Sequence, residues 1–513
     1  MTKNRAFILT NLLLLFLSVF VLFGCSKSTT TKVPEKKERV APDYSEDNGL
    51  RFNYFGTGPS DGIINIDGNQ IYNPDHRNKE SYQVFKDAGF NWALIGSYIR
   101  PDICSSKEDF LAKNGAAIDA LNEVGFDYII LSDYRFTNVL SRLDGGLIGK
   151  GKMFPDEKAL DDYISNCISM YKDIPGINGI QLGDEPCYTG LESFAQVYKS
   201  LRRVWPEAFI WYNFFAFGIG GNFDIMFGKP EPKEGQSSND AAKEKYEEYI
   251  NRALDLMGPD VKYFSIDSYP MTTNGIGNGH IATFQICSNI AKKRGIDFYC
   301  WTQSMAMNKG SNLHYRELSE ADCIWMNNMI LGFGINTIGY FNYVTGTDNN
   351  SSGENWPDGT SFIDHQNEKT YLYDIYQKIN LDNQEFAKVI LNFDYRGCKP
   401  FASTNSKLGT SQVALVDDSF VLKKISNVTI DKECAIINEL YDTKNRQYMY
   451  MIMNVIDSAQ KGSKAYQTIE VTFDDEFEYV LEYKNGVPKV VELVDHKYTV
   501  EQWAGQAVYV LPY

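Results

Sequence analysis

From residue 51 onward the sequence repeats one pattern, in which a short apolar run precedes a longer amphipathic segment. Residues 126–132 (FDYIILS), for example, follow a helical segment that closes on Gly125. The short runs predict β-strands and the amphipathic segments predict helices. The expected strands span residues 51–57, 90–96, 126–132, 176–183, 208–215, 261–267, 296–302 and 335–343.

Eight strands that each lead into a helix are the number that closes a parallel barrel. An open, doubly wound sheet is the competing architecture, but it would need a glycine-rich phosphate turn. Gly218–Gly221 (GIGG) follows the fifth expected strand without the dinucleotide spacing. We therefore expect an α/β fold with a (β/α)8 TIM barrel over residues 50–383.

The pattern changes after residue 383. Ile469, Val471 and Phe473 alternate with polar residues, as in a strand with one buried face. Asn485-Gly486 stands between two such runs and is a strong signal for a two-residue hairpin. Residues 384–513 are therefore expected to form an antiparallel β-sandwich domain that packs on the barrel.

The N-terminus has the pattern of an export signal. A short basic region precedes the apolar run Leu12–Phe23, which is too short for a stable spanning helix. Residues 22–25 (LFGC) are similar to a bacterial lipobox, which implies lipidation of Cys25 at the end of a signal peptide over 1–25. Residues 26–49 are polar and predict a flexible linker, so we expect an extracytoplasmic protein anchored to a bacterial membrane by lipid alone.

The composition narrows the choice of partners and cofactors. The formal net charge of -16 disfavours nucleic acid as a partner. Only five histidines occur, and no cysteine pair has the spacing of a metal site, so neither a metal nor another cofactor is predicted. Disulfides are permitted in this compartment, but the sequence does not pair the cysteines.

Polar and aromatic residues follow the expected strands, at the end of the barrel where active sites lie. Such a mouth suits carbohydrate, because aromatic rings stack on the CH-rich faces of sugars and carboxyl groups can cleave the glycosidic bond. The predicted substrate-binding residues are Asp133, Asp184, Asn213, Tyr269, Trp301, Gln303, Tyr340 and Tyr343.

The sharpest motif is Gly183-Asp184-Glu185-Pro186, directly after the fourth expected strand. It resembles the Asn-Glu-Pro turn that ends strand four in the large clan of retaining barrel glycoside hydrolases. The resemblance implies that Glu185 is the general acid and that Asp184 takes the place of the Asn that binds the sugar 2-hydroxyl. An Asp at that place is a departure from the pattern.

The seventh expected strand departs further, because members of that clan place a nucleophilic Glu there. Here it ends in Trp301-Thr302-Gln303, and an amide can neither attack an anomeric carbon nor take a proton. Asp267, at the end of the sixth strand, is the preferred second catalytic carboxylate, and Asp133 and Asp184 remain alternatives. A carboxyl separation of about 5 Å would indicate retention, and about 6.5–9.5 Å inversion.

Two functions compete. The first is an extracellular glycoside hydrolase acting on poly- or oligosaccharide, with Glu185 as acid. The second is an inert, surface glycan-binding lipoprotein on a degenerate barrel, for which the missing carboxylate of strand seven is the main support. The Asp-Glu-Pro turn favours the enzyme, because binding alone needs no proton donor.

Overall fold

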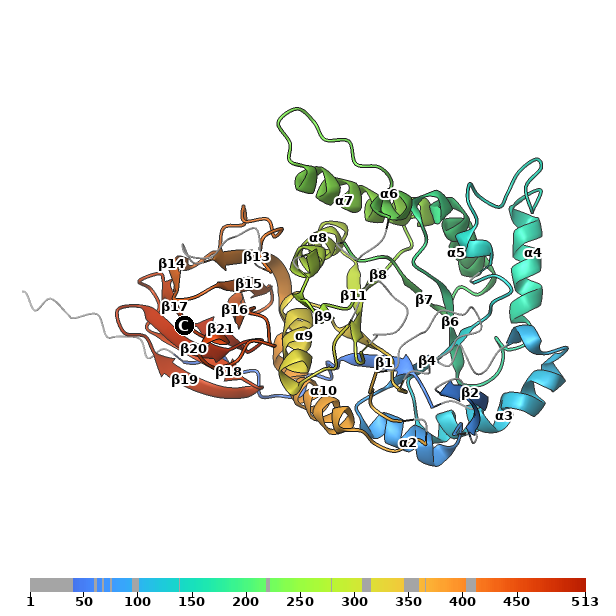
Figure 1. Ribbon diagram of the computed structural model, residues 1–513, viewed down its shortest axis with the longest axis horizontal. Helices are drawn as coiled ribbons and strands as arrows, with labels where there is room; N and C mark the ends of the chain where they lie inside the picture. The colour runs from blue at the N-terminus through green and yellow to red at the C-terminus, as the bar shows by residue number, and fades with distance from the viewer. Residues whose placement is uncertain are drawn as a thin grey trace, which may run out of the picture. The chain divides into compact units, whose positions relative to one another are not determined.

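The computed structural model describes residues 40–513 except 60–61, 67–68, 74–75, 95–100, 138, 218–221, 278, 307–314, 346–358, 365 and 403–411, and describes only the backbone of 62–73. It is a TIM barrel followed by a β-sandwich (Figure 1), which confirms the predicted fold class. No helix in the described ranges is long and apolar enough to cross a membrane. Cys25 and the expected signal peptide lie outside the described residues.

The barrel sheet contains eight parallel strands, and each matches an expected one to within a few residues. Around the sheet their order is β7-β6-β5-β4-β1-β12-β11-β8. The strands are β1 (Asn53–Thr57), β4 (Trp92–Leu94), β5 (Tyr128–Ser132), β6 (Ile177–Asp184), β7 (Phe209–Asn213), β8 (Tyr263–Ser268), β11 (Asp297–Gln303) and β12 (Thr337–Phe341). Two short hairpins were not predicted, β2–β3 (Gly62–Ile66 and Asn69–Asn73) and β9–β10 (Met271–Thr272 and Gly275–Ile276).

The helices between the strands begin at local capping signals. Ser106, Asp156, Ser237 and Ser319 each accept a hydrogen bond from a backbone N–H of the first turn. The helices are α2 (Lys79–Asp87), α3 (Lys107–Val124), α4 (Glu157–Ile168), α5 (Leu191–Val204), α6 (Phe223–Phe227), α7 (Ser238–Met257), α8 (Gly279–Arg294), α9 (Glu320–Gly332) and α10 (Tyr371–Ile390).

The barrel closes between β7 and β8 largely through side chains. One backbone bond crosses this seam, from Phe214 N to Ser265 O (2.9 Å). The Tyr263 hydroxyl accepts from Ile210 N (3.0 Å) and donates to Ile210 O (2.8 Å). Buried backbone groups that face a gap in the ladder thus find partners, as they must inside a protein.

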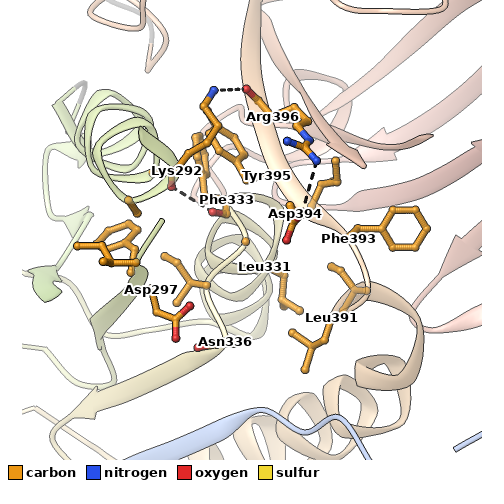
Figure 2. Close-up of a pocket in the computed structure, with 18 of the residues that line it drawn as sticks. Lys292, Asp297, Leu331, Phe333, Asn336, Leu391, Phe393, Asp394, Tyr395 and Arg396 are labelled. Atoms are coloured by element: carbon orange, nitrogen blue, oxygen red, sulfur yellow. Dashed lines mark hydrogen bonds and ion pairs between the residues drawn. The ribbon is translucent and has the colours of Figure 1, made fainter. Parts of the chain in front are cut away.

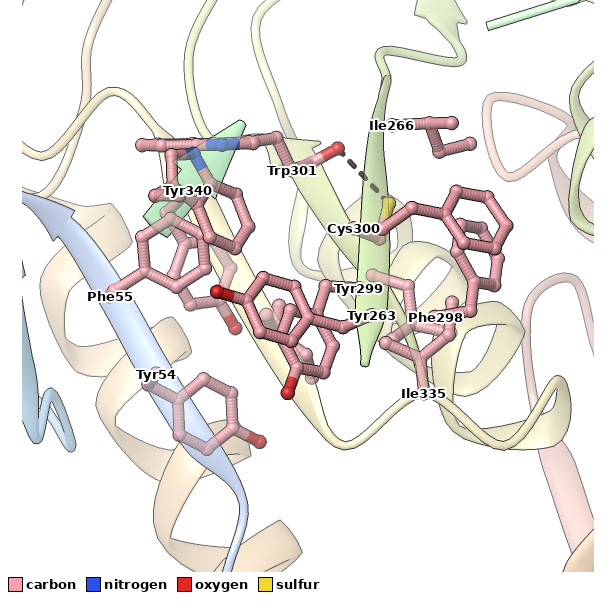
Figure 3. Packing of buried hydrophobic residues seen from close by; sticks show 14 of the residues in the cluster. Tyr54, Phe55, Tyr263, Ile266, Phe298, Tyr299, Cys300, Trp301, Ile335 and Tyr340 are labelled. Atoms are coloured by element: carbon pink, nitrogen blue, oxygen red, sulfur yellow. Dashed lines mark hydrogen bonds between the residues drawn. The ribbon is translucent and has the colours of Figure 1, made fainter. Parts of the chain in front are cut away.

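Aromatic side chains fill the barrel interior in layers. Tyr263 stacks between Phe209 and Tyr299, with ring centroids 4.9 Å away on each side. Nearer the carboxyl ends of the strands, the Phe55 ring lies edge to face with that of Trp301, at 4.5 Å (Figure 3). It also lies edge to face with Trp211, at 4.2 Å. The interior is therefore packed with side chains, and the mouth of the barrel is the place to look for a site.

The C-terminal domain consists of two antiparallel sheets. The six-stranded sheet has the order β13-β15-β16-β21-β18-β19, and the three-stranded sheet β14-β17-β20. Their strands are β13 (Asp394–Ala402), β14 (Ile425–Ile430), β15 (Cys434–Asp442), β16 (Gln447–Asn454), β17 (Tyr466–Phe473), β18 (Tyr479–Lys484), β19 (Val487–Glu492), β20 (Lys497–Trp503) and β21 (Ala507–Pro512). The Asn485-Gly486 turn joins β18 to β19 as predicted.

Both expected domain boundaries fall within ordered structure. The boundary at residue 383 lies inside α10, which continues to Ile390. The end of the expected linker is anchored, because the Tyr44 hydroxyl donates to Asp442 (2.9 Å) and the Tyr44 ring lies 5.2 Å from that of Phe393. Residues 44–49 are thus part of the folded body, because the Tyr44 ring packs against Phe393 at the start of the sandwich domain.

Candidate active site

Three carboxyl groups meet at the carboxyl ends of β6 and β8. Asp184 and Glu185 are consecutive at the end of β6, and Asp267 lies near the end of β8. Successive strand residues normally point to opposite faces. Glu185, however, has a φ of 50°, in the left-handed region, and this breaks the alternation. Both side chains can then interact electrostatically with Asp267.

Backbone contacts hold the turn that carries Glu185. Its N–H donates to Asn213 O (2.9 Å), and the buried Tyr249 hydroxyl donates to Pro186 O (2.6 Å). Asn213 also donates from Nδ2 to Asp184 Oδ1 (3.3 Å). The turn is therefore fixed from β7 and α7.

Glu185 and Asp267 are hydrogen-bonded to each other through their side chains. Asp267 is only 7% exposed, and its Oδ1 receives no hydrogen bond from a hydroxyl, amide or cationic group of the described residues. A buried carboxylate normally has such partners. Asp267 faces another carboxyl group instead, and two carboxyl groups so placed hold a proton between them.

The surroundings raise the pKa values of both Glu185 and Asp267. Burial raises the pKa of Glu185 well above its usual range, and the negative charges of Asp267 and Asp184 add to the rise. Burial raises the pKa of Asp267 to about 7, although the hydrogen bond with Glu185 opposes this. Burial therefore favours the protonated form of both groups, and the pair can share one proton near neutral pH.

Asp184 is the accessible member of the group, with 45% of its side chain exposed. Desolvation by the surrounding protein raises the pKa of Asp184, and the positive charge of Arg142 opposes this rise. Arg142 donates from its guanidinium to Asp184 O (2.6 Å) and lies 4.0 Å from the carboxylate. Arg142 was not predicted, because it follows no strand directly.

Aromatic rings border the carboxyl groups. Tyr269 lies 6.1 Å from Tyr315, edge to face, and 5.6 Å from Phe341. Burial raises the pKa of Tyr269 far above its usual range, and the charges of Asp267, Asp184 and Glu185 contribute. Tyr315 interacts electrostatically with Asp267 and Glu185. Tyr315 was missed because it stands twelve residues beyond β11, in a loop without periodicity.

Gln303, where a carboxylate was expected, is fully buried and bonded to backbone. Its Oε1 accepts from Met271 N (3.0 Å), and its Nε2 donates to Met271 O (3.4 Å) and Met305 O (3.1 Å). A carboxylate could accept from Met271 but could not donate to either carbonyl. Gln303 therefore pins the start of the β9–β10 hairpin and is not free to contact a substrate.

Three further predicted residues do not reach this group. Asp133 is fully buried beneath Arg135, which binds both of its oxygens (2.9 and 2.6 Å), and Tyr171 donates to it (3.0 Å). The Tyr340 hydroxyl donates to Asn380 (2.7 Å) and lies 3.2 Å from Asn327, both on helices outside the barrel. Tyr343 is buried against Phe85, at 4.5 Å. All three side chains stabilise the fold. Trp301 is 6% exposed within the interior packing.

A separate cavity of about 440 Å³ lies at the opposite end of the barrel, beside the sandwich (Figure 2). Its walls include Lys292, Asp297, Tyr395 and Arg396. Asp297 begins β11, so this cavity is at the amino ends of the strands, away from the three carboxyl groups. Within the described ranges, no cluster of three or more His, Cys, Asp and Glu side chains could hold a metal ion.

Comparisons with known proteins give distant structural neighbours. No protein-family model and no curated protein matches the chain. Similar solved structures include a GH30 endoxylanase from Clostridium papyrosolvens (11% identity, 90% of this chain and 96% of that one, TM-score 0.38). Others are an endo-beta-1,4-mannanase from Thermotoga petrophila (13%, 89% and 99%, 0.37) and an alpha-amylase from Anoxybacillus (10%, 92% and 99%, 0.45). At such identities and TM-scores these neighbours carry no functional argument, and any function must be argued from the carboxyl groups themselves.

Proposed function

We propose that the chain is a glycoside hydrolase in which Glu185 is the general acid and Asp267 is the second catalytic carboxylate. The observation that carries the proposal is the pair itself, two buried carboxyl groups in contact whose pKa values are both raised, that of Asp267 to about 7. Such a pair can hold one protonated and one ionised group near neutral pH, and cleavage of a glycosidic bond requires this combination.

The close spacing favours the retaining route. Two carboxyl groups in contact leave no room for the water that inversion needs, which takes a separation of about 6.5–9.5 Å. Substrate binding would replace the hydrogen bond between the two groups. Asp267 would then attack the anomeric carbon while Glu185 gives its proton to the departing oxygen. In the second step, Glu185 takes a proton from water, whose oxygen displaces Asp267.

Neighbouring groups supply the remaining functions. The exposed Asp184 offers a carboxylate for sugar hydroxyls beside the acid, and the buried Asn213 amide orients that carboxylate. Tyr269 offers a partly exposed ring for a sugar face. The substrate class proposed is therefore poly- or oligosaccharide.

The test is hydrolysis of activated aryl glycosides and natural glycans by residues 40–513. Glu185→Gln and Asp267→Asn should each abolish turnover, and the exposed Glu247→Gln on α7 is the matched control, which should retain full rates. NMR of the first-formed anomer should show retention. Activity that survives both variants would refute the proposal.

The fixed role of Gln303 favours the alternative, an inert glycan-binding barrel, because the carboxyl end of β11 offers no carboxylate. Absence of turnover together with equal glycan binding by the wild type and Glu185→Gln would support that alternative.

We also propose that Cys25 carries a lipid that anchors the protein outside the cytoplasm. The support is the sequence of residues 22–25. Mass spectrometry of the N-terminal peptide from the membrane fraction should show the acyl chains, and Cys25→Ser should release the protein from that fraction.

A further inference from the structure

A buried ionic cluster joins the barrel to the sandwich domain. Arg316 Nη2 lies 2.6 Å from Asp322 Oδ1 on α9 and 2.9 Å from Asp457 Oδ1 in the loop after β16. The Arg316 side chain is 14% exposed, that of Asp322 3% and that of Asp457 12%. Ser458 also contacts both Arg316 (3.2 Å) and Asp322. A cation so enclosed is held by the geometry of its partners.

Within this cluster, Asp322 has a second duty. Its Oδ2 accepts from the Ser319 N–H and hydroxyl, both at 2.9 Å, and closes the N-terminus of α9. Asp457 does not cap a barrel helix in this way. Besides Arg316, its Oδ1 accepts a hydrogen bond from the Ala459 N–H of its own loop (2.9 Å). The sandwich therefore contributes one of the two carboxylates that fix Arg316.

The backbone around Arg316 is tied to the hairpin beside the candidate site. Arg316 N donates to Met271 O (3.0 Å), and its side chain donates to Thr272 O (3.4 Å). Tyr315 forms a β-bridge with Thr272. The turn of the hairpin also lies against Asp457, because a Cβ placed on Gly275 would be 2.8 Å from Asp457 Oδ2.

Tyr315 connects this cluster to the chemistry. Its ring stands edge to face with Tyr269, and it interacts electrostatically with both Asp267 and Glu185. An error of about 1 Å in such a group can cost up to about a hundredfold in rate.

We infer that Asp457 of the sandwich domain is a positioning residue for the active site, acting through Arg316 to place Tyr315 and the β9–β10 hairpin beside Glu185 and Asp267. This inference rests on the proposed function for its catalytic meaning. The sandwich domain thus completes the site, and the barrel alone would lack one anchor of the loop that carries Tyr315.

The test compares Asp457→Asn and Asp457→Glu with Glu482→Gln in the full described chain. Glu482 accepts from Tyr498 inside the sandwich and controls for a general disturbance of that domain. Hydrogen exchange should accelerate in residues 271–276 and 315–318 for Asp457→Asn, while α3 and α4 remain unchanged. On a substrate that the wild type hydrolyses, Asp457→Asn should lower kcat/KM about tenfold to a hundredfold, largely through KM, and Asp457→Glu should restore part of the loss.

The two readouts separate the two ways of failing. If the wild type hydrolyses nothing but the exchange change occurs, the proposed function fails and the link from Asp457 to the hairpin stands. Unchanged exchange at 271–276 and 315–318 in Asp457→Asn would overturn the inference, as would an equal effect of Glu482→Gln.

Discussion

Replacement of Asp267 by Asn should make the protein more stable at alkaline pH, in contrast to the usual result for a buried aspartate. The structure holds the Asp267 pKa at about 7, against 3.8 for the unfolded chain. Because the folded pKa is the higher one, the folded state binds the proton more tightly. The stability contributed by this proton is complete below about pH 4 and is lost as the pH rises through 7.

The magnitude follows from the shift. About three pKa units at 1.36 kcal/mol each correspond to roughly 4 kcal/mol, an upper limit because the pair shares one proton. Asp267→Asn removes this cost, so its melting temperature should match the wild type near pH 4.5 and exceed it by several degrees at pH 8.5.

Asp133→Asn is the matched control, because Asp133 is also buried but is paired with Arg135 and Tyr171. Loss of its charge leaves the guanidinium without its counter-ion and should destabilise the fold by about 3–5 kcal/mol. Thermal unfolding from pH 4.5 to 8.5 measures both variants. If Asp267→Asn is the less stable protein at pH 8.5, or if its difference from the wild type does not grow with pH, the reasoning about the unpaired carboxylate is wrong.

Three further outcomes follow from the same contacts. The acidic limb of kcat/KM, measured by initial rates, should fall near pH 7, as Asp267 takes up its proton. Gln303→Glu should lose its two donated hydrogen bonds, destabilise by about 2–4 kcal/mol in denaturant titrations and restore no catalysis. Tyr249→Phe removes the hydroxyl that donates to Pro186 O and so frees the turn that carries Glu185. Expressed as free energies, the loss in kcat should exceed the loss in the free energy of unfolding. Equal kcat in the wild type and in Tyr249→Phe would contradict this.

The sequence predicted the barrel well because each buried parallel strand forms a separate apolar run. It also placed Glu185 and Asp267 at strand ends that the fold brings together. It could not determine which strand residues face inward at the last strand, where residues 338–343 (IGYFNY) carry aromatic side chains at both parities. Phe341 thus contacts Tyr269 at the mouth, whereas Tyr340 faces the helices.

The remaining differences arise from backbone conformation and from contacts between distant segments. The positive φ of Glu185 brings the carboxyl groups of two consecutive residues to the same side of the strand end. The local sequence does not predict this backbone conformation. In the sequence, Asp133 and Asp267 both stand as polar residues at the end of an apolar strand. Only the structure shows that Asp133 is paired with Arg135, two residues later. Asp457 belongs to another domain, so only the folded chain shows that it anchors the loop of Tyr315.

The contrast between Asp133 and Asp267 is the strongest reason to assign chemistry to the mouth of the barrel. Asp133 has a cation and a hydroxyl for its buried oxygens, as an aspartate that only stabilises a fold should. Asp267 has no such partner for Oδ1 and lies against a second acid whose backbone conformation is itself unfavourable by about 1–2 kcal/mol. Both costs fall on one pair of neighbouring carboxyl groups at the mouth of the barrel. A strained acid beside a buried carboxylate oxygen of this kind is more readily explained by function than by stability.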